Sequence, residues 1–160
     1  MTMTQTAQTT QVYQLYIRAT PEQVWDAITN PTTIAKYFHG AQVDEGPLEV
    51  GAARTSWSPD RSQLWGDNTI LECDPPRRFA WAVGDPARPS ATWRFTLKPD
   101  GEGTRLEQWY QMGPARSGLN IAIDAMPDKE QKIVFVRLRE HETGMKHNLE
   151  LIKDQAERAG

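Results

Sequence analysis

One histidine lies on the apolar face of the last predicted helix, where it could take part in acid–base chemistry. The residue is His141, which recurs with Leu138 and Met145 at helical spacing. An imidazole titrates near pH 6.5, so beside a cavity it could exchange a proton with a ligand or hydrogen-bond to a ligand carbonyl group. The alternative is a histidine at the edge of the core whose partner is a side chain or a water molecule. The sequence leaves both interpretations open.

Aromatic side chains gather in the middle of the chain, which holds five of the six tryptophans. Aromatic walls with a few polar groups are typical of small-molecule sites, although each aromatic residue taken alone is more often core. The polar strand residues Arg54, Asn68 and Gln108 need partners if they point inward, and a ligand, water or backbone could supply them. The expected ligand-binding residues are Trp81, Trp93, Phe95, Gln108, Tyr110, Leu138, His141 and Met145.

Other kinds of chemistry lack their motifs. A zinc-helix motif H-E-x-x-H begins at His141, but Met145 stands where the second histidine belongs. His147 is six residues on, about 240° around the helix, and so it faces another way. The chain has no G-x-S-x-G elbow and no P-loop, and Cys73 is followed by an aspartate that raises a thiol pKa. We therefore expect no metal, no cofactor and no catalytic residue other than the candidate His141.

Gly144 interrupts the same helical pattern. A glycine inside a helix costs about 1 kcal/mol relative to alanine, so its presence needs a reason. Two reasons are open: the glycine leaves room for a ligand, or it allows close packing against a tryptophan.

The elements that position these residues follow from the periodicity. From Pro127 onward, apolar residues recur at spacings of three and four, which predicts a helix of about thirty residues and roughly 45 Å. That stripe consists of Val134, Leu138, His141, Met145, Leu149, Ile152 and Ala156. Residues 41–112 alternate with a period of two between turn signals, which predicts an antiparallel meander with one buried face. Before it, the pattern predicts a strand over 12–19 and two short helices capped at Thr20 and Asn30. Residues 117–125 are a candidate short helix.

Composition excludes several classes of partner. Eighteen basic and 21 acidic residues give a net charge of −3 without a basic patch, which disfavours nucleic acid and polybasic membrane attachment. No apolar run approaches the ~20 residues that span a bilayer. The N-terminal residues lack the features of a secretory signal, and a single cysteine excludes an intrachain disulfide. We expect a disordered tail over residues 1–11 and one cytoplasmic domain over residues 12–160.

Three segments carry a family resemblance: A-T-P-E-Q-V-W-D-A at 19–27, L-E-C-D-P-P-R-R-F at 71–79, and T-W-R-F at 92–95 leading to G-T-R-L at 103–106. With the order of elements, they make the chain similar to the START-like, or SRPBCC, superfamily, in the branch named after the activator of Hsp90 ATPase homologue. The resemblance implies an α+β helix-grip fold, in which a curved antiparallel sheet of six to seven strands wraps a long C-terminal helix.

The resemblance also implies a cavity between sheet and helix. Related domains bind lipids, sterols, polyketides, plant hormones or aromatic compounds, and a minority are cyclases or aromatases. We therefore expect a non-catalytic binder of an apolar or aromatic, lipid-like or polyketide-like molecule. One alternative is a cyclase-type enzyme that uses His141 with Gln108 or Arg54. Another is a protein-interaction domain that assists a chaperone or forms a homodimer through the edge of the first strand.

Overall fold

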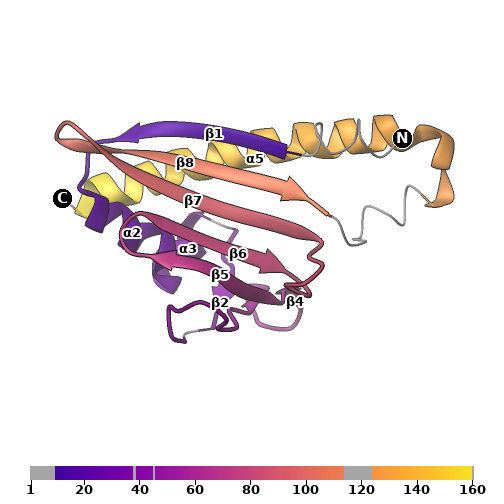
Figure 1. Cartoon of the computed structure of the whole chain (residues 1–160), viewed down its shortest axis with the longest axis horizontal. Coiled ribbons are helices and arrows are strands. Elements are labelled where there is room, and N and C mark those ends of the chain that lie inside the picture. Colours follow the sequence, from indigo (N-terminus) through magenta and orange to yellow (C-terminus); the bar gives the residue numbers. More distant parts are fainter. Residues whose placement is uncertain (1–9, 38, 45, 114–123, 160) are drawn as a thin grey trace.

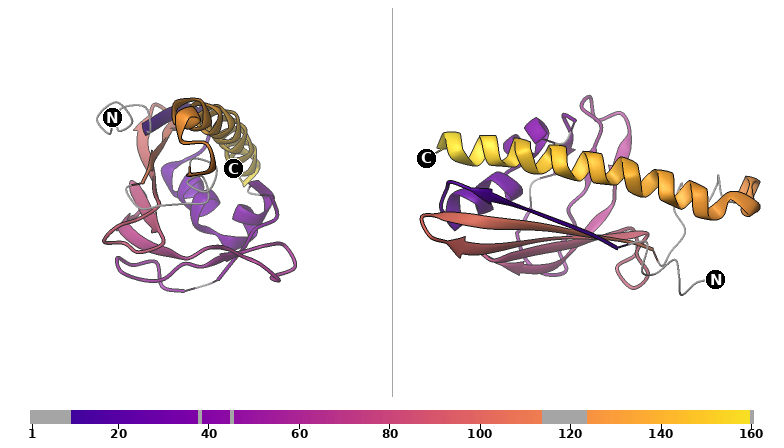
Figure 2. Two further views of the ribbon diagram at one scale, coloured as in Figure 1. Left: turned by 90° about the vertical axis from the view of Figure 1, so that its right-hand side faces the viewer. Right: turned by 90° about the horizontal axis from the view of Figure 1, so that it is seen from above.

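A curved antiparallel sheet and a long helix make up most of the molecule (Figure 1). The computed structural model describes residues 10–37, 39–44, 46–113 and 124–159. The last helix runs along the sheet, and the two short helices lie beside its C-terminal half (Figure 2). This arrangement is the helix-grip fold that the order of elements predicted.

The main sheet has five strands in the order β1-β8-β7-β6-β5, and all its neighbours are antiparallel. Its strands are β1 (Thr10–Ile17), β5 (Asn68–Asp74), β6 (Arg78–Val83), β7 (Ala91–Asp100) and β8 (Gly103–Met112). Gln108 on β8 lies opposite Tyr13 and Phe95, and Phe95 lies opposite Phe79. Residues that are directly opposite share a face of the sheet. These four side chains therefore form one row across its inner face.

A second, three-stranded sheet adjoins the first, so the strands form two sheets instead of the expected single one. It contains β2 (Gln42–Val43), β3 (Ser56–Trp57) and β4 (Leu64–Gly66), in that order. The intervening residues are rich in glycine, proline, serine and aspartate, which favour turns over extended pairing. The register also shifts at β3. An isolated bridge between Ala53 and Thr69 links this part of the chain to β5 of the main sheet.

Both short helices begin at the predicted caps. In α2 (Pro21–Thr29), the hydroxyl group of Thr20 accepts a hydrogen bond from the Gln23 amide at 3.2 Å, and the Gln23 side chain accepts one from the Thr20 amide at 2.9 Å. In α3 (Pro31–Tyr37), the Asn30 side chain accepts a hydrogen bond from the Thr32 amide at 2.9 Å. The capping box fixes the path of the chain from β1 into α2.

The long helix α5 spans Glu130–Ala159 and follows a single 3-10 turn, η1 (Pro127–Lys129). Its 30 residues match the predicted length. The buried members of the predicted stripe are Val134, Met145, Leu149, Ile152 and Ala156. Among the described helices, none combines the length and the apolar character needed to cross a lipid bilayer. The candidate helix over 117–125 lies almost entirely outside the described residues.

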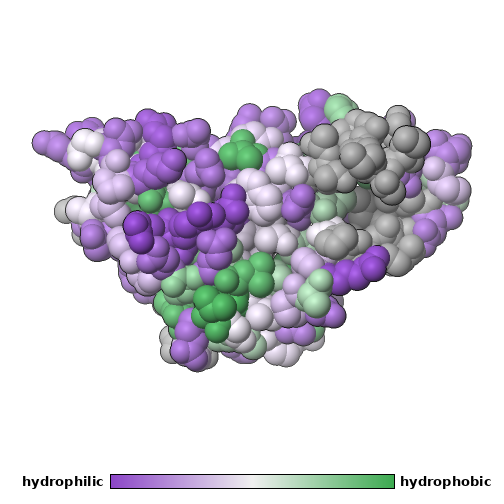
Figure 3. Space-filling view, in the orientation of Figure 1, coloured by the Kyte–Doolittle hydropathy of each residue, from purple (hydrophilic) through white to green (hydrophobic). Residues whose placement is uncertain are grey.

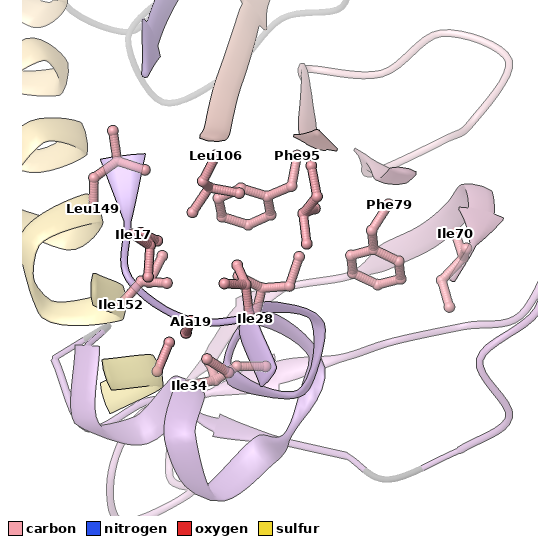
Figure 4. Close-up of a cluster of buried hydrophobic side chains, with 14 residues drawn as sticks. Ile17, Ala19, Ile28, Ile34, Ile70, Phe79, Phe95, Leu106, Leu149 and Ile152 are labelled. Atoms are coloured by element: carbon pink, nitrogen blue, oxygen red, sulfur yellow. The ribbon is translucent and has the colours of Figure 1, made fainter. Parts of the chain in front are cut away.

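The core joins all these elements (Figure 4). Side chains from the sheet, both short helices and α5 meet in one cluster, which includes Ile17, Ile28, Leu106 and Ile152. The outer face of the sheet is largely hydrophilic, with a hydrophobic patch over the β5 end (Figure 3). Four members of this cluster also line the cavity described below, which therefore adjoins the packed core: Ile28, Ile34, Phe79 and Phe95.

The first strand begins earlier than expected. β1 starts at Thr10, so Thr10 and Gln11 belong to the sheet and not to the expected tail. They extend the pairing with β8, and the Gln11 side chain also donates a hydrogen bond to the Leu138 carbonyl oxygen at 2.7 Å. The rest of the expected tail lies outside the described residues.

Candidate ligand-binding site

A cavity of about 360 Å³ lies between the inner face of the main sheet, the second sheet, the short helices and α5. Small-molecule sites usually have volumes of ~300–1,000 Å³, so this one is large enough for a compact ligand. Its aromatic lining consists of Trp65, Phe79, Trp81, Trp93 and Phe95. Its polar lining consists of Arg54, Ser56, Asn68, Gln108 and Asn148. Trp65 is also 42% exposed and therefore marks the mouth of the cavity.

Four of the aromatic side chains, Phe79, Trp81, Trp93 and Phe95, form an aromatic wall because of the register between β6 and β7. β6 and β7 pair Trp81 with Trp93 and Phe79 with Phe95. The two indoles stack with ring centroids 6.3 Å apart, and Trp81 is 5.9 Å from Phe95 and 5.6 Å from Phe79. Offset and tilted ring pairs of this kind are favourable beyond the area they bury. The result is a continuous apolar surface on one side of the cavity.

Gln108 places an amide group against this apolar surface. Its side chain is 4% exposed and lines the cavity. Its Oε1 atom is buried and has no hydrogen-bond partner in the structure. A buried carbonyl oxygen without a partner costs about 1–3 kcal/mol, which a suitable ligand would recover.

Arg54 is the only charged side chain among the described residues that line the cavity. Its guanidinium donates a hydrogen bond to the Thr29 carbonyl oxygen and lies over the Phe79 ring, 5.6 Å from the centroid. The Asn68 side chain in turn donates to the Arg54 carbonyl oxygen at 2.9 Å. These contacts fix the arginine between the end of α2 and β6.

His141 on α5 lies beside the aromatic wall, next to Tyr110 and Trp93. Its ring is 4.6 Å from the Tyr110 ring and 6.0 Å from the Trp93 ring, and its Nδ1 atom is buried without a partner. Burial lowers the pKa of His141, and the nearby Arg137 lowers it further, while Glu140 raises it. Burial also raises the pKa of Tyr110 to about 12. Both rings are therefore neutral at pH 7.

Stability should depend on pH through His141. In the unfolded chain the imidazole takes up a proton near pH 6.5, whereas the folded chain resists protonation because the pKa of His141 is lowered. The free energy of unfolding should therefore fall as the pH drops from 7.5 to 5.5, and should fall less in His141→Gln. Urea unfolding of both proteins at the two pH values measures this difference. Equal losses in the two proteins would contradict it.

The structure brings four of the eight predicted ligand-binding residues to the cavity: Trp81, Trp93, Phe95 and Gln108. Tyr110 and His141 lie next to them, in contact with Trp93. Met145 is buried, and Leu138 lines a separate open groove beside the start of β1. A ligand-binding role for these residues stays a prediction.

Several lining residues escaped prediction. Asn148 on α5 follows His141 by seven residues, so helical spacing could have placed the two on one face. Val43, Ser56 and Trp65 form a wall from the second sheet. Their segments are too short and irregular to show a periodic pattern, and so this wall could not be predicted from periodicity.

Gly144 lies one turn before Asn148 on α5, and a Cβ atom there would meet no other atom within 4 Å. Close packing of this glycine against a tryptophan is therefore wrong. Room for a ligand stays a prediction, since Gly144 is not among the residues that line the cavity. We expect Gly144→Ala to raise the free energy of unfolding by about 1 kcal/mol, because alanine favours the helix and meets no obstacle. Thermal and urea unfolding measure the change, and a loss of stability would contradict it.

Other reactive groups show no assembled site in the described part of the chain. No group of three His, Cys, Asp or Glu side chains lies close enough there to hold a metal ion. The Cys73 thiol donates a hydrogen bond to the Leu48 carbonyl oxygen at 3.2 Å. Burial raises the pKa of Cys73, with a smaller increase from Asp74 and an opposing effect of Arg54. This thiol is thus less nucleophilic than a free cysteine.

Fold and cavity together define a helix-grip domain of the START-like, or SRPBCC, superfamily. The sequence over residues 7–130 matches the family described as polyketide cyclase / dehydrase and lipid transport. Because this match covers about three quarters of the chain, the protein belongs to that family. No curated protein sequence matches the chain.

Solved structures share the fold. A polyketide-cyclase-like protein from Corynebacterium glutamicum has a TM-score of 0.69 at 22% identity, covering 90% of this chain and 88% of its own. A protein from Mesorhizobium loti has a TM-score of 0.66 at 20% identity, with coverages of 94% and 98%. An AHSA1-like protein from Aeromonas hydrophila has a TM-score of 0.63 at 16% identity, with coverage of 94% of each chain. At these identities the likeness concerns the fold alone.

Proposed function

We propose that this protein binds a small, largely apolar aromatic molecule in the cavity between the main sheet and α5, without transforming it. The observation that carries the proposal is an aromatic-walled cavity with a buried, unpartnered amide oxygen at Gln108. Cavities that combine apolar walls with a few placed polar groups are the usual form of small-molecule sites. The family description, which includes lipid transport, supports a hydrophobic ligand in general.

An enzymatic role has less support. It would need an acid or base in contact with the ligand, and the imidazole of His141 is not among the groups that line the cavity. The lowered pKa of His141 leaves it a poor proton donor at neutral pH. Binding and carriage require no such group, and the cavity suits them as it stands.

Native mass spectrometry of the purified protein, followed by denaturing extraction, tests the proposal. We expect a reproducible extra mass that is lost on denaturation and that belongs to an aromatic or lipid-like compound. The variant Asn148→Trp, which places an indole in the cavity, should lose this mass. His147→Trp is the matched control, because His147 is the exposed neighbour of Asn148 on α5.

Retention of the same adduct by Asn148→Trp would place the bound molecule elsewhere and contradict the proposal. Protein that stays free of ligand, both as purified and after incubation with aromatic compounds, would also contradict it.

A further inference from the structure

We propose that the ligand carries a hydroxyl group on an aromatic ring, and that Gln108 selects it by hydrogen bonding to this hydroxyl. The inference rests on the proposed function and adds the chemical feature that the site recognises. Gln108 then determines specificity. The aromatic wall contributes to affinity but does not distinguish ligands by their polar groups.

Gln108 is enclosed by its neighbours on the inner face of the sheet. The residue lies on β8, between Tyr13 of β1 and Phe95 of β7. Its neighbours on the same face of β8 are Leu106 and Tyr110, both buried. With 4% of its surface exposed, the side chain is shielded from bulk water, and its Oε1 atom is buried without a partner. Because Gln108 lines the cavity, a molecule bound there can supply the missing donor.

A hydroxyl group matches a primary amide better than other small polar groups do. The amide presents an accepting oxygen and a donating nitrogen, and a hydroxyl group both donates and accepts. It can therefore donate a hydrogen bond to Oε1, the atom that lacks a partner. A ketone or an ether can only accept a hydrogen bond, and a hydrocarbon can neither donate nor accept one. Each of these ligands would leave the Gln108 oxygen buried and unpaired.

The surroundings of the amide indicate that the hydroxyl group is on a ring. Phe95 lies directly opposite Gln108, and Trp81 is 5.9 Å from Phe95. A group within hydrogen-bonding reach of Gln108 therefore sits at the edge of the aromatic wall. A planar molecule that lies against this wall with its hydroxyl group at the edge satisfies both surfaces at once.

Isothermal titration calorimetry with two probes, naphthalene and 2-naphthol, tests the inference. The probes share a ring system and differ by one hydroxyl group. The wild-type protein should bind 2-naphthol about tenfold more tightly than naphthalene, which corresponds to one recovered hydrogen bond. In Gln108→Leu this preference should disappear, because leucine has a similar size and no polar atom. Gln111→Leu makes the same change on the opposite face of β8, and it should keep the preference.

The outcomes separate the inference from the proposed function. If wild-type protein binds both probes equally, or if Gln108→Leu keeps the preference, the inference is overturned while a binding role stands. If wild-type protein binds neither probe, both are overturned for ligands of this kind. Circular dichroism checks that Gln108→Leu is folded, and Gln108→Met serves as a second variant with the same expected result.

Discussion

Phe95→Ala should lower the free energy of unfolding by about 3–5 kcal/mol. Phe95 lies in the middle of β7 with 2% of its surface exposed, and its ring contacts the Trp81 ring in the aromatic wall of the cavity. Removing the ring forfeits both its burial and its contacts, and the surrounding strands cannot close the gap. Because small domains are stable by only about 5–15 kcal/mol, the loss should be plain in urea unfolding at 25 °C.

Phe135→Ala is the matched control for this change. Phe135 lies on α5 and is 58% exposed, so the same substitution removes little buried area. Its effect should stay within about 0.5 kcal/mol, the usual range for surface positions. If the two variants lost similar stability, Phe95 would not be the core residue that the structure describes.

Gly103→Ala should cost about 3 kcal/mol, at the upper end of the range for overpacked sites. Gly103 is the first residue of β8 and is buried against the end of β1. A Cβ atom there would lie 2.4 Å from the Ile17 carbonyl oxygen and 2.5 Å from the Tyr16 hydroxyl oxygen. The tyrosine could swing aside, but the carbonyl oxygen belongs to the strand pairing and cannot. Thermal unfolding measures the loss.

The nearby Gly101 provides the comparison. It occupies the turn between β7 and β8 with a φ of +61°, and a Cβ atom there would meet nothing within 4 Å. Asparagine tolerates this backbone conformation better than most residues, so Gly101→Asn should cost less than about 1 kcal/mol. A larger loss at Gly101 than at Gly103 would show that turn conformation, and not strand contact, limits this hairpin.

Local signals predicted the elements of the fold well. The Thr20 capping box and the Asn30 cap were predictable because each is a hydrogen bond between a side chain and a nearby backbone amide. Both caps occur as expected. The α5 stripe was predictable because three- and four-residue spacing places its members on one face whatever lies opposite. The alternation around Phe95 likewise predicted the inner face of the sheet.

The candidate site was only partly predictable, because it depends on which elements meet. Gln108 could be placed inside from alternation alone, since its neighbours at positions 106 and 110 are apolar. Leu138 shares the helical stripe, but it lies beyond the cavity along α5, where it faces a different groove. Helical periodicity predicts which face of α5 a residue occupies. It does not predict whether the cavity extends to that point along the helix axis.

The wall from the second sheet was beyond prediction for another reason. Ser56 and Trp65 reach the cavity only because turn-rich segments fold back over the β5 end of the main sheet. Turn residues in such segments predict where the chain bends, but they do not predict which part of the fold the following residues contact.

The pairing of β1 with β8 bears on how the protein is made. The first strand leaves the ribosome about ninety residues before its partner, and α5, which also packs on β1, leaves last. Until β8 emerges β1 has no neighbouring strand, and until α5 emerges the inner face of β1 has no helix to cover it. Contacts between such distant segments slow folding, because a long loop must close before they form. The nascent chain should therefore stay open until α5 has emerged, and a ribosome stalled at residue 129 should display a protease-sensitive β1.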